Sequence, residues 1–150
     1  MMDADAPLPE FDLGRFTPYR LAVAAKRTSE ALARRYRERF GISIPEWRVL
    51  VHLAHAGDDT SVRDIEAEVQ LERYEVSRTA KRLEEKGLLV KTTSETDRRL
   101  VRLCLTPRGR EVMAELLPLA QGYQAEIEAR LGAAFAGLEA GLDGILRDAE

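Results

Sequence analysis

The chain has 150 residues and a formal net charge of −3; 45% of the residues are hydrophobic and 33% are charged, the balance of an ordinary globular domain. No apolar run approaches the roughly 20 residues of a membrane span, and the acidic start MMDADAPLPEFD lacks the order of a secretory signal. The single cysteine, Cys104, excludes an internal disulfide, so we expect one domain over residues 1–150 in the reducing cytoplasm.

The first two elements are predicted to be helices. Apolar residues at spacings of three and four predict a helix over about residues 17–40, which Gly41 ends. Ser43 and Glu46 have the spacing of a capping box. A second helix is therefore expected to begin there and to end near Gly57.

Two more helices and a hairpin follow. A second capping pattern, Ser61 with Asp64, begins a short helix, and a longer helix is expected over residues 72–86. The inward stripe of the longer helix is Val76, Ala80 and Leu83. The period then changes to that of β-structure, because residues 88–94 and 100–106 are rich in Val, Leu and Thr and flank the polar turn ETDRR.

The chain closes with two helices. Thr106 and Pro107 open a helix of roughly 25 residues, which Pro118 is expected to interrupt and kink; a last helix carries Leu138 and Ile145. The middle of the chain thus has the order of a winged helix-turn-helix. The flanking helices have more apolar surface than such a domain can cover, which predicts an antiparallel or intertwined dimer.

The charge is unevenly distributed along the chain. Residues 76–110 contain 10 Lys or Arg and 4 Asp or Glu, an excess of +6, whereas residues 111–150 contain 2 and 8. A basic segment on an acidic body is the electrostatic footprint expected of a protein that binds a polyanion. A solvated surface with uneven charge is the alternative interpretation.

The helix expected over residues 72–86 is the candidate DNA-reading element, because a helix fits the major groove. With the apolar stripe turned inward, six side chains project outward. The side chains assigned to bases are Arg73, Tyr74, Ser77 and Arg78, and those assigned mainly to phosphate are Lys81 and Arg82. The alternative is an amphipathic surface helix with scattered charges.

The hairpin turn offers a second DNA contact. A wing tip can reach the minor groove, whose negative potential attracts arginine. Arg98 and Arg99 would lie there, while Asp97 orients one guanidinium. The alternative is an ordinary turn with its arginines in solvent.

The stretch from Ser61 to Val112 resembles the DNA-binding core of the MarR family of bacterial regulators. The matching segments are VSR at 76–78, RLEEKGLL at 82–89, DRR at 97–99 and LTPRG at 105–109. The resemblance implies a mainly α fold with a small β wing. The winged helix-turn-helix core would span about residues 43–110, with dimerisation helices over about 12–40 and 111–150.

The resemblance also implies a function. Members of the family are homodimers that bind pseudo-palindromic operators; most repress, and many release DNA when a small, often aromatic or anionic, molecule binds. In the family's pattern the Asp of the wing supports it and the Arg two residues on enters the minor groove, roles that fall on Asp97 and Arg99, with Arg98 beside them. Glu72 and Glu75 depart from the pattern, because they repel phosphate unless they accept from cytosine or a neighbouring arginine.

The expected ligand pocket lies between the first two helices and the base of the fifth. Its candidate residues are Tyr19, Arg20, Arg27 and Trp47. An arginine there would bind a carboxylate or the phosphates of a coenzyme A ester. The segments PYRL and SIPEWRVL resemble those of relatives that respond to aromatic acids or their coenzyme A esters. Alternatively, Arg20 forms a salt bridge at a dimer interface.

Other chemistry is not expected. Oxidant-sensing relatives carry a cysteine near the first helix, whereas Cys104 lies in an expected strand and is interpreted as a packing residue. His52 and His55 have no third histidine or cysteine to join them, so neither a metal nor a cofactor is expected. No nucleophile elbow or phosphate loop points to an enzyme. The remaining rival is a helical adaptor that uses the winged fold to bind another protein.

Overall fold

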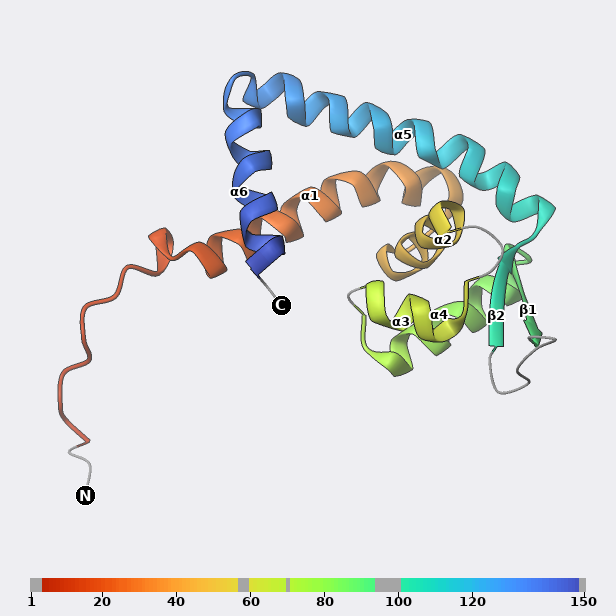
Figure 1. Ribbon diagram of the computed structural model, residues 1–150, viewed down its shortest axis with the longest axis horizontal. Coiled ribbons are helices and arrows are strands. Elements are labelled where there is room, and N and C mark those ends of the chain that lie inside the picture. The colour runs from red at the N-terminus through yellow and green to blue at the C-terminus, as the bar shows by residue number, and fades with distance from the viewer. Residues whose placement is uncertain (1–3, 57–59, 70, 94–100, 149–150) are drawn as a thin grey trace.

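The fold is mainly α with a small β wing (Figure 1). The computed structural model describes residues 4–56, 60–69, 71–93 and 101–148. The elements in chain order are a 3-10 turn (Leu13–Arg15), α1 (Thr17–Phe40), α2 (Ile44–Ala56), α3 (Val62–Glu68), α4 (Arg73–Glu85), β1 (Leu89–Thr93), β2 (Val101–Leu105), α5 (Pro107–Leu131) and α6 (Ala134–Asp148). The middle elements, from α2 to β2, form the winged helix-turn-helix, and the long helices α1 and α5 run side by side away from it.

Both capping patterns read from the sequence start the expected helices. Ser43 Oγ accepts from the amide of Glu46 at 3.3 Å, and the amide of Ser43 donates to Glu46 Oε1 at 3.1 Å. The matching pair of hydrogen bonds joins Ser61 and Asp64, both at 3.1 Å. Gly41 ends α1 with a φ of 64°, the left-handed conformation that glycine adopts without strain. These local signals fix where the helices of the DNA-binding part begin and end.

The core is shared by the helices α1 to α5 and the wing. The predicted inward stripe of α4 is confirmed, since Val76, Ala80 and Leu83 are at most 1% exposed. They pack in one cluster with Leu50 of α2 and Leu103 of β2. Burial of this stripe orients α4, so its opposite face lies at the surface.

The wing is joined to the start of α3. β1 and β2 pair antiparallel, with Leu89 opposite Leu105, and the amide of Leu103 donates to the carbonyl of Thr60 at 3.0 Å. The face of β2 that carries Val101 and Leu103 is only partly buried: Leu103 is 0% exposed, but Val101, at the far end of the strand, is 41% exposed. The wing is therefore held at its base and projects beyond the core.

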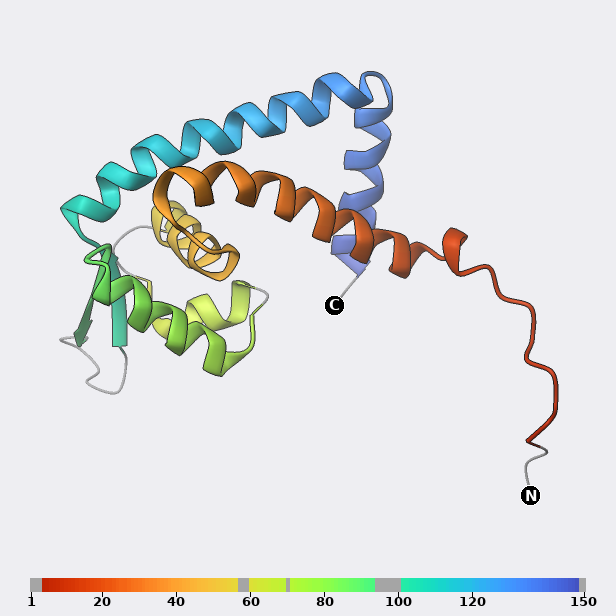
Figure 2. The same ribbon diagram turned by 180° about the vertical axis from the view of Figure 1, so that it is seen from behind.

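The prediction that Pro118 interrupts the fifth helix is wrong, because α5 is continuous from Pro107 to Leu131. Proline lacks an amide proton and leaves the carbonyl four residues before it without a helical donor. Here that carbonyl belongs to Ala114, and both Ala114 and Pro118 are exposed, so water can supply the missing donor. Figure 2 shows α5 as one gently arched rod beside α1, with α6 turning back from its far end.

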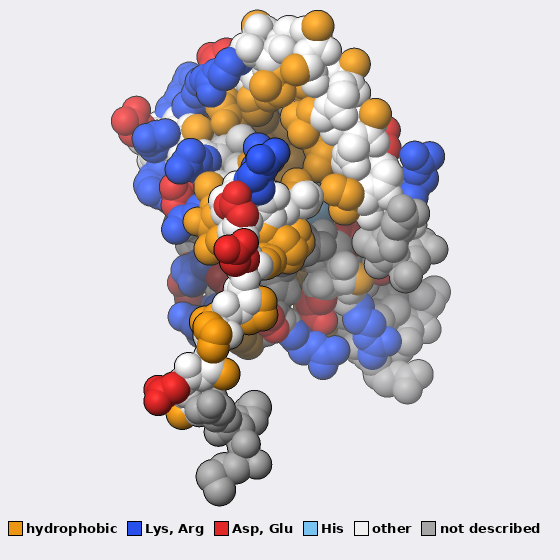
Figure 3. Space-filling model, turned by 90° about the vertical axis from the view of Figure 1, so that its left-hand side faces the viewer, with side chains coloured by type: hydrophobic (Ala, Val, Ile, Leu, Met, Phe, Trp, Pro, Cys, Tyr) orange, Lys and Arg blue, Asp and Glu red, His pale blue; other side chains and the backbone are white. Residues whose placement is uncertain are grey.

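Apolar side chains remain exposed on the N-terminal arm and on α6. Phe11 and Leu13 are 66% and 50% exposed, and Ile145 and Leu146 of α6 are 45% and 71% exposed. Figure 3, which views the molecule from this end, shows hydrophobic side chains along the arm and around the hollow behind it. Within the described ranges, no helix is long and apolar enough to cross a membrane.

Candidate nucleic-acid interface

The outward face of α4 carries the side chains that the sequence assigned to DNA. Its exposed residues from Arg73 to Lys81, hereafter the reading face, are Arg73, Tyr74, Ser77, Arg78 and Lys81, and the exposed Glu84 and Glu85 follow at the end of the helix. Tyr74 is 63% exposed, so most of its ring is accessible on this face. Arg82 differs from the others: it is half-buried, and its Nη2 donates to Thr79 Oγ1 at 3.2 Å.

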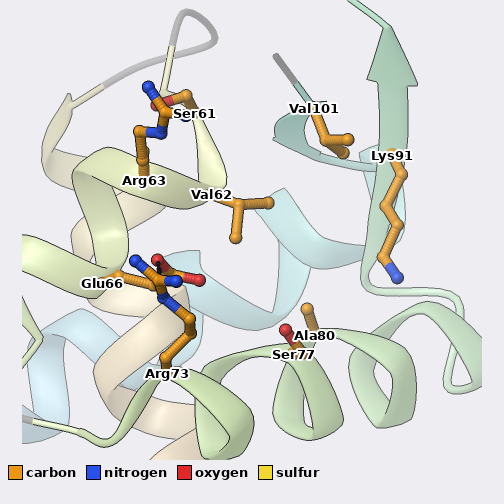
Figure 4. Close-up of a pocket in the computed structure, with 9 residues that line it drawn as sticks. All are labelled: Ser61, Val62, Arg63, Glu66, Arg73, Ser77, Ala80, Lys91 and Val101. Atoms are coloured by element: carbon orange, nitrogen blue, oxygen red, sulfur yellow. Dashed lines mark ion pairs between the residues drawn. The ribbon is translucent and has the colours of Figure 1, made fainter. Parts of the chain in front are cut away.

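A groove with a volume of about 400 Å³ lies between α3, α4 and the wing (Figure 4). Its lining residues are Ser61, Val62, Arg63, Glu66, Arg73, Ser77, Ala80, Lys91 and Val101. Arg63 and Lys91 add two cations beside the reading face that the sequence reasoning missed. Arg63 follows the cap of α3 by two positions, but nothing in the sequence places it, or Lys91 of β1, opposite α4.

Arg73 is paired with a carboxylate from the neighbouring helix. Its Nε lies 3.3 Å from Glu66 Oε2; the side chain of Arg73 is 84% exposed and that of Glu66 is 17% exposed. Figure 4 shows the two side chains facing each other between α3 and α4. Glu72 and Glu75, which repel phosphate unless they accept from cytosine or a neighbouring arginine, form no ion pair with another described residue.

The wing supplies the second expected contact. Thr93 pairs with Val101 at the open end of the strands. Asp97, Arg98 and Arg99 lie outside the described residues, so their assignment remains a prediction. Cys104 is half-buried and lies opposite Val90 in the strand pair.

The C-terminal end of α4 is anchored by a partly buried ion pair. Lys86, which caps α4, has its Nζ 2.6 Å from Glu46 Oε2 and donates to the carbonyl of Gly41 at 3.1 Å. Glu46 is 3% exposed. Burial alone would raise the pKa of Glu46, but the ammonium of Lys86 and the hydrogen bonds with Ser43 bring it below its usual 4.5. This contact ties the helix that carries the reading face to the junction of α1 and α2.

The four residues expected around a ligand do not meet within one protomer. Tyr19 and Arg20 are exposed in the first turn of α1. Trp47 stacks on Tyr36, with ring centroids 5.4 Å apart, and Tyr36 lies about 25 Å further along α1 at 1.5 Å per residue. Arg27 lines a separate groove of about 560 Å³ between α1 and α5.

That groove between α1 and α5 is rich in arginine. Its charged lining residues are Arg27, Glu30, Arg34, Arg35, Glu126 and Arg130. Arg35 pairs with Glu126 and lies over the ring of Tyr123, 5.1 Å from its centroid. The hydrogen bond from Arg35 lowers the pKa of Glu126 below its usual 4.5. An anionic group would meet an excess of positive charge here.

The two histidines lie apart from this groove. His52 lines a pocket of about 240 Å³ with Asp64 and Glu68, and His55 is exposed. Where the structure describes side chains, no group of three or more His, Cys, Asp or Glu residues is arranged to hold a metal ion.

Comparisons with known proteins agree with this geometry. A sequence model described as the MarR family matches residues 40–100, the segment that holds α2, α3, α4 and β1. No curated protein sequence matches the chain.

Solved structures share the fold over most of the chain. A MarR/EmrR family transcriptional regulator from Acinetobacter sp. ADP1 is 25% identical, with a TM-score of 0.79 over 92% of this chain and 96% of that chain. BpsR of Bordetella bronchiseptica, whose DNA binding is regulated by 6-hydroxynicotinic acid, is 22% identical, with a TM-score of 0.78 over 95% and 100% of the two chains. NadR, solved in complex with 4-hydroxyphenylacetate, is 24% identical, with a TM-score of 0.78 over 95% and 100%. At these identities, the similarity to BpsR and NadR shows a shared fold and nothing more.

Proposed function

We propose that the chain is a transcription regulator of the MarR family, whose model matches residues 40–100, and that it acts as a homodimeric repressor of a pseudo-palindromic operator. The reading face of α4 enters the major groove, and the wing, with Asp97, Arg98 and Arg99, reaches the neighbouring minor groove. The observation that carries this proposal is the reading face itself, exposed on a helix whose opposite side is buried in the core. Such a regulator acts in the cytoplasm.

The groove beside the reading face extends the contact to the DNA backbone. Arg63 and Lys91 lie on either side of it, so a helix in the major groove would bring both cations near phosphates. Contacts of this kind release counterions and make affinity fall steeply with salt. They position the protein without reading sequence, which leaves base recognition to α4.

Arg78→Ala is the direct test of the reading face. Arg78 is exposed at the centre of α4 and forms no ion pair with another described residue. A duplex enriched from a randomised pool by the wild-type protein serves as the probe. We expect the variant to bind it about 5- to 150-fold more weakly, the range of one lost bidentate base contact, and to lose less on a scrambled duplex of the same length.

Arg37→Ala is the matched control, because Arg37 is an exposed arginine on α1 that belongs neither to the reading face nor to the apolar arm and α6. It should bind both duplexes as the wild type does. Equal binding of the enriched duplex by Arg78→Ala and wild type would remove Arg78 from the interface. Failure of the wild-type protein to enrich any duplex would favour the helical adaptor instead.

Dimerisation is supported by the exposed apolar end of the molecule. Phe11, Leu13, Ile145 and Leu146 are 45–71% exposed in one chain, and large exposed apolar areas mark protein–protein interaction sites. A twofold arrangement would cover the arm and α6 and set two copies of α4 on one face. Light scattering should give twice the chain mass of 16.9 kDa.

A small aromatic acid is the proposed effector. Two proteins of the same fold are associated with such molecules, 6-hydroxynicotinic acid for BpsR and 4-hydroxyphenylacetate for NadR. Tyr19, Arg20, Arg27 and Trp47 stay the candidate contacts; those too far apart within one chain would have to meet through a second protomer. The arginines that line the groove together with Arg27 are suited to bind a carboxylate.

Thermal unfolding with these acids and with aromatic coenzyme A esters tests the effector. A ligand at 100 times its dissociation constant stabilises the protein by about 2.7 kcal/mol, which raises the melting temperature by about 5–10 °C for a chain of this size. The same ligand should release the enriched duplex. Benzene derivatives without a carboxylate serve as controls. If no acid or ester shifts the melting curve, the aromatic-acid proposal is wrong.

A further inference from the structure

The Glu66–Arg73 pair joins the two helices of the helix-turn-helix at the edge of the reading face. We propose that Glu66 is a positioning residue: it holds the guanidinium of Arg73 in one orientation and so determines which base pair Arg73 reads. This inference rests on the proposed DNA-binding function and adds a residue of α3 to it. Glu66 itself touches no DNA in this proposal.

The geometry leaves Arg73 able to bind a base. The contact with Glu66 is made through Nε, and the two terminal nitrogens of a guanidinium carry four further N–H groups. Guanine presents two acceptors, O6 and N7, to a bidentate arginine in the major groove. A long exposed side chain loses rotamer freedom when it binds. Because Glu66 restricts Arg73 beforehand, part of that loss is removed from the binding step.

Glu66 is suited to this role because it is itself held in place. Its side chain is only 17% exposed, against 84% for Arg73, and it stands on α3, which packs against α4. Because the guanidinium of Arg73 is largely in water, the ion pair is screened and contributes little to folding stability. The pair is therefore better explained by the orientation of Arg73 than by stability of the fold.

The positioning role of Glu66 can be tested by whether DNA binding becomes weaker or tighter when its charge is removed. A carboxylate on a surface that faces a polyanion opposes binding, so removing its charge should tighten binding to every duplex if charge is its only effect. If Glu66 positions Arg73, removing its charge weakens binding to the specific duplex, while binding to an unrelated duplex stays equal or tightens. The two roles thus predict opposite changes on the specific sequence.

The experiment compares Glu66→Gln with wild type on the enriched and the scrambled duplex at one salt concentration. We expect Glu66→Gln to bind the enriched duplex about fivefold more weakly or worse, which is about 1 kcal/mol or more of lost discrimination. Binding to the scrambled duplex should be unchanged or tighter. In an Arg73→Ala background, Glu66→Gln should cause no further loss on the enriched duplex, since the group that it positions is gone.

Glu68→Gln is the matched control, because Glu68 is an exposed acid on the same helix with no ion pair to another described residue. It should bind both duplexes as tightly as wild type or slightly more tightly. Equal tightening on both duplexes by Glu66→Gln would overturn the positioning role and leave the regulator proposal intact. A wild-type protein that enriches no sequence would instead overturn the regulator proposal, and this inference with it.

Discussion

Gly109→Ala is expected to destabilise the protein by about 3 kcal/mol, at the upper end of the cost of overpacking a core. A Cβ atom on Gly109 would lie 2.1 Å from the carbonyl oxygen of Leu88 and 3.3 Å from Leu105 Cδ2. The oxygen of Leu88 cannot simply move away, because it accepts from the amide of Thr106 at 3.1 Å. The start of α5 would have to separate from the start of β1. Thermal unfolding should show a melting temperature lower by about 6–12 °C.

Gly122→Ala is the control on the same helix. No atom lies within 4 Å of a Cβ built on Gly122, and alanine is favoured over glycine inside a helix by about 0.5–1 kcal/mol. This substitution should therefore stabilise slightly. Equal melting temperatures for the Gly109 and Gly122 variants would mean that the close approach of α5 to the wing does not restrict residue size. The expected contrast gives a steric reason for the glycine in the LTPRG segment.

Lys86→Met should produce the second large loss, about 2–3 kcal/mol of unfolding free energy at neutral pH. Apart from this ion pair, Glu46 Oε2 has no hydrogen-bond partner in the described structure, so the substitution leaves a buried carboxylate unpaired. Removing one partner of a fully buried pair costs about 3–5 kcal/mol. The lower figure applies here because the side chain of Lys86 is 40% exposed and part of the interaction is screened.

The unfolding free energy lost in Lys86→Met is expected to become smaller as the pH falls. In the wild type the pKa of Glu46 lies below its usual 4.5, so the pair stabilises the fold fully above about pH 4.5 and less as the pH falls through the lowered pKa. In Lys86→Met, burial without the ammonium raises the pKa of Glu46, so protonation relieves the unpaired charge. The difference between variant and wild type should narrow from pH 7 towards pH 4 in urea unfolding.

Two further variants test whether the stability lost in Lys86→Met comes from the unpaired charge of Glu46. The double substitution Glu46→Gln with Lys86→Met should recover much of the stability, because no unpaired charge remains. Lys26→Met, at an exposed position of α1, should change the stability by less than about 0.5 kcal/mol. A loss in Lys86→Met that is the same at pH 7 and pH 4 would show that the lysine acts through packing and not through its charge.

The elements that the sequence predicts well are those set by neighbouring residues. Ser43 with Glu46 is a pattern of four residues, and it starts α2 as expected. The spacing of Val76, Ala80 and Leu83 identifies the buried side of α4, and with it the side that faces outward. Pro118 misled the prediction because its effect depends on whether water reaches the carbonyl of Ala114, which the local sequence does not state.

The contacts that connect distant elements could not be predicted. Lys86 and Glu46 are separated by α3 and α4, and only the packing of α2 against α4 brings them together. Glu66 and Arg73 flank a turn whose path decides whether their side chains meet. For the ligand, the sequence grouped Tyr19 and Trp47 as candidates for one pocket, whereas the length of α1 separates them within one chain. A sequence pattern that suggests which side chains could pair does not say how far apart the fold holds them.

The unbroken length of α5 has a mechanical consequence. Its 25 residues span about 37 Å at 1.5 Å per residue, from the base of the wing to the turn before α6. A tilt of about 5° at one end displaces the other end of such a lever by about 3 Å, close to the 3.4 Å step between base pairs. In the homodimer proposed above, a slight repacking where the two subunits meet would therefore shift each wing by about one base-pair step along the DNA.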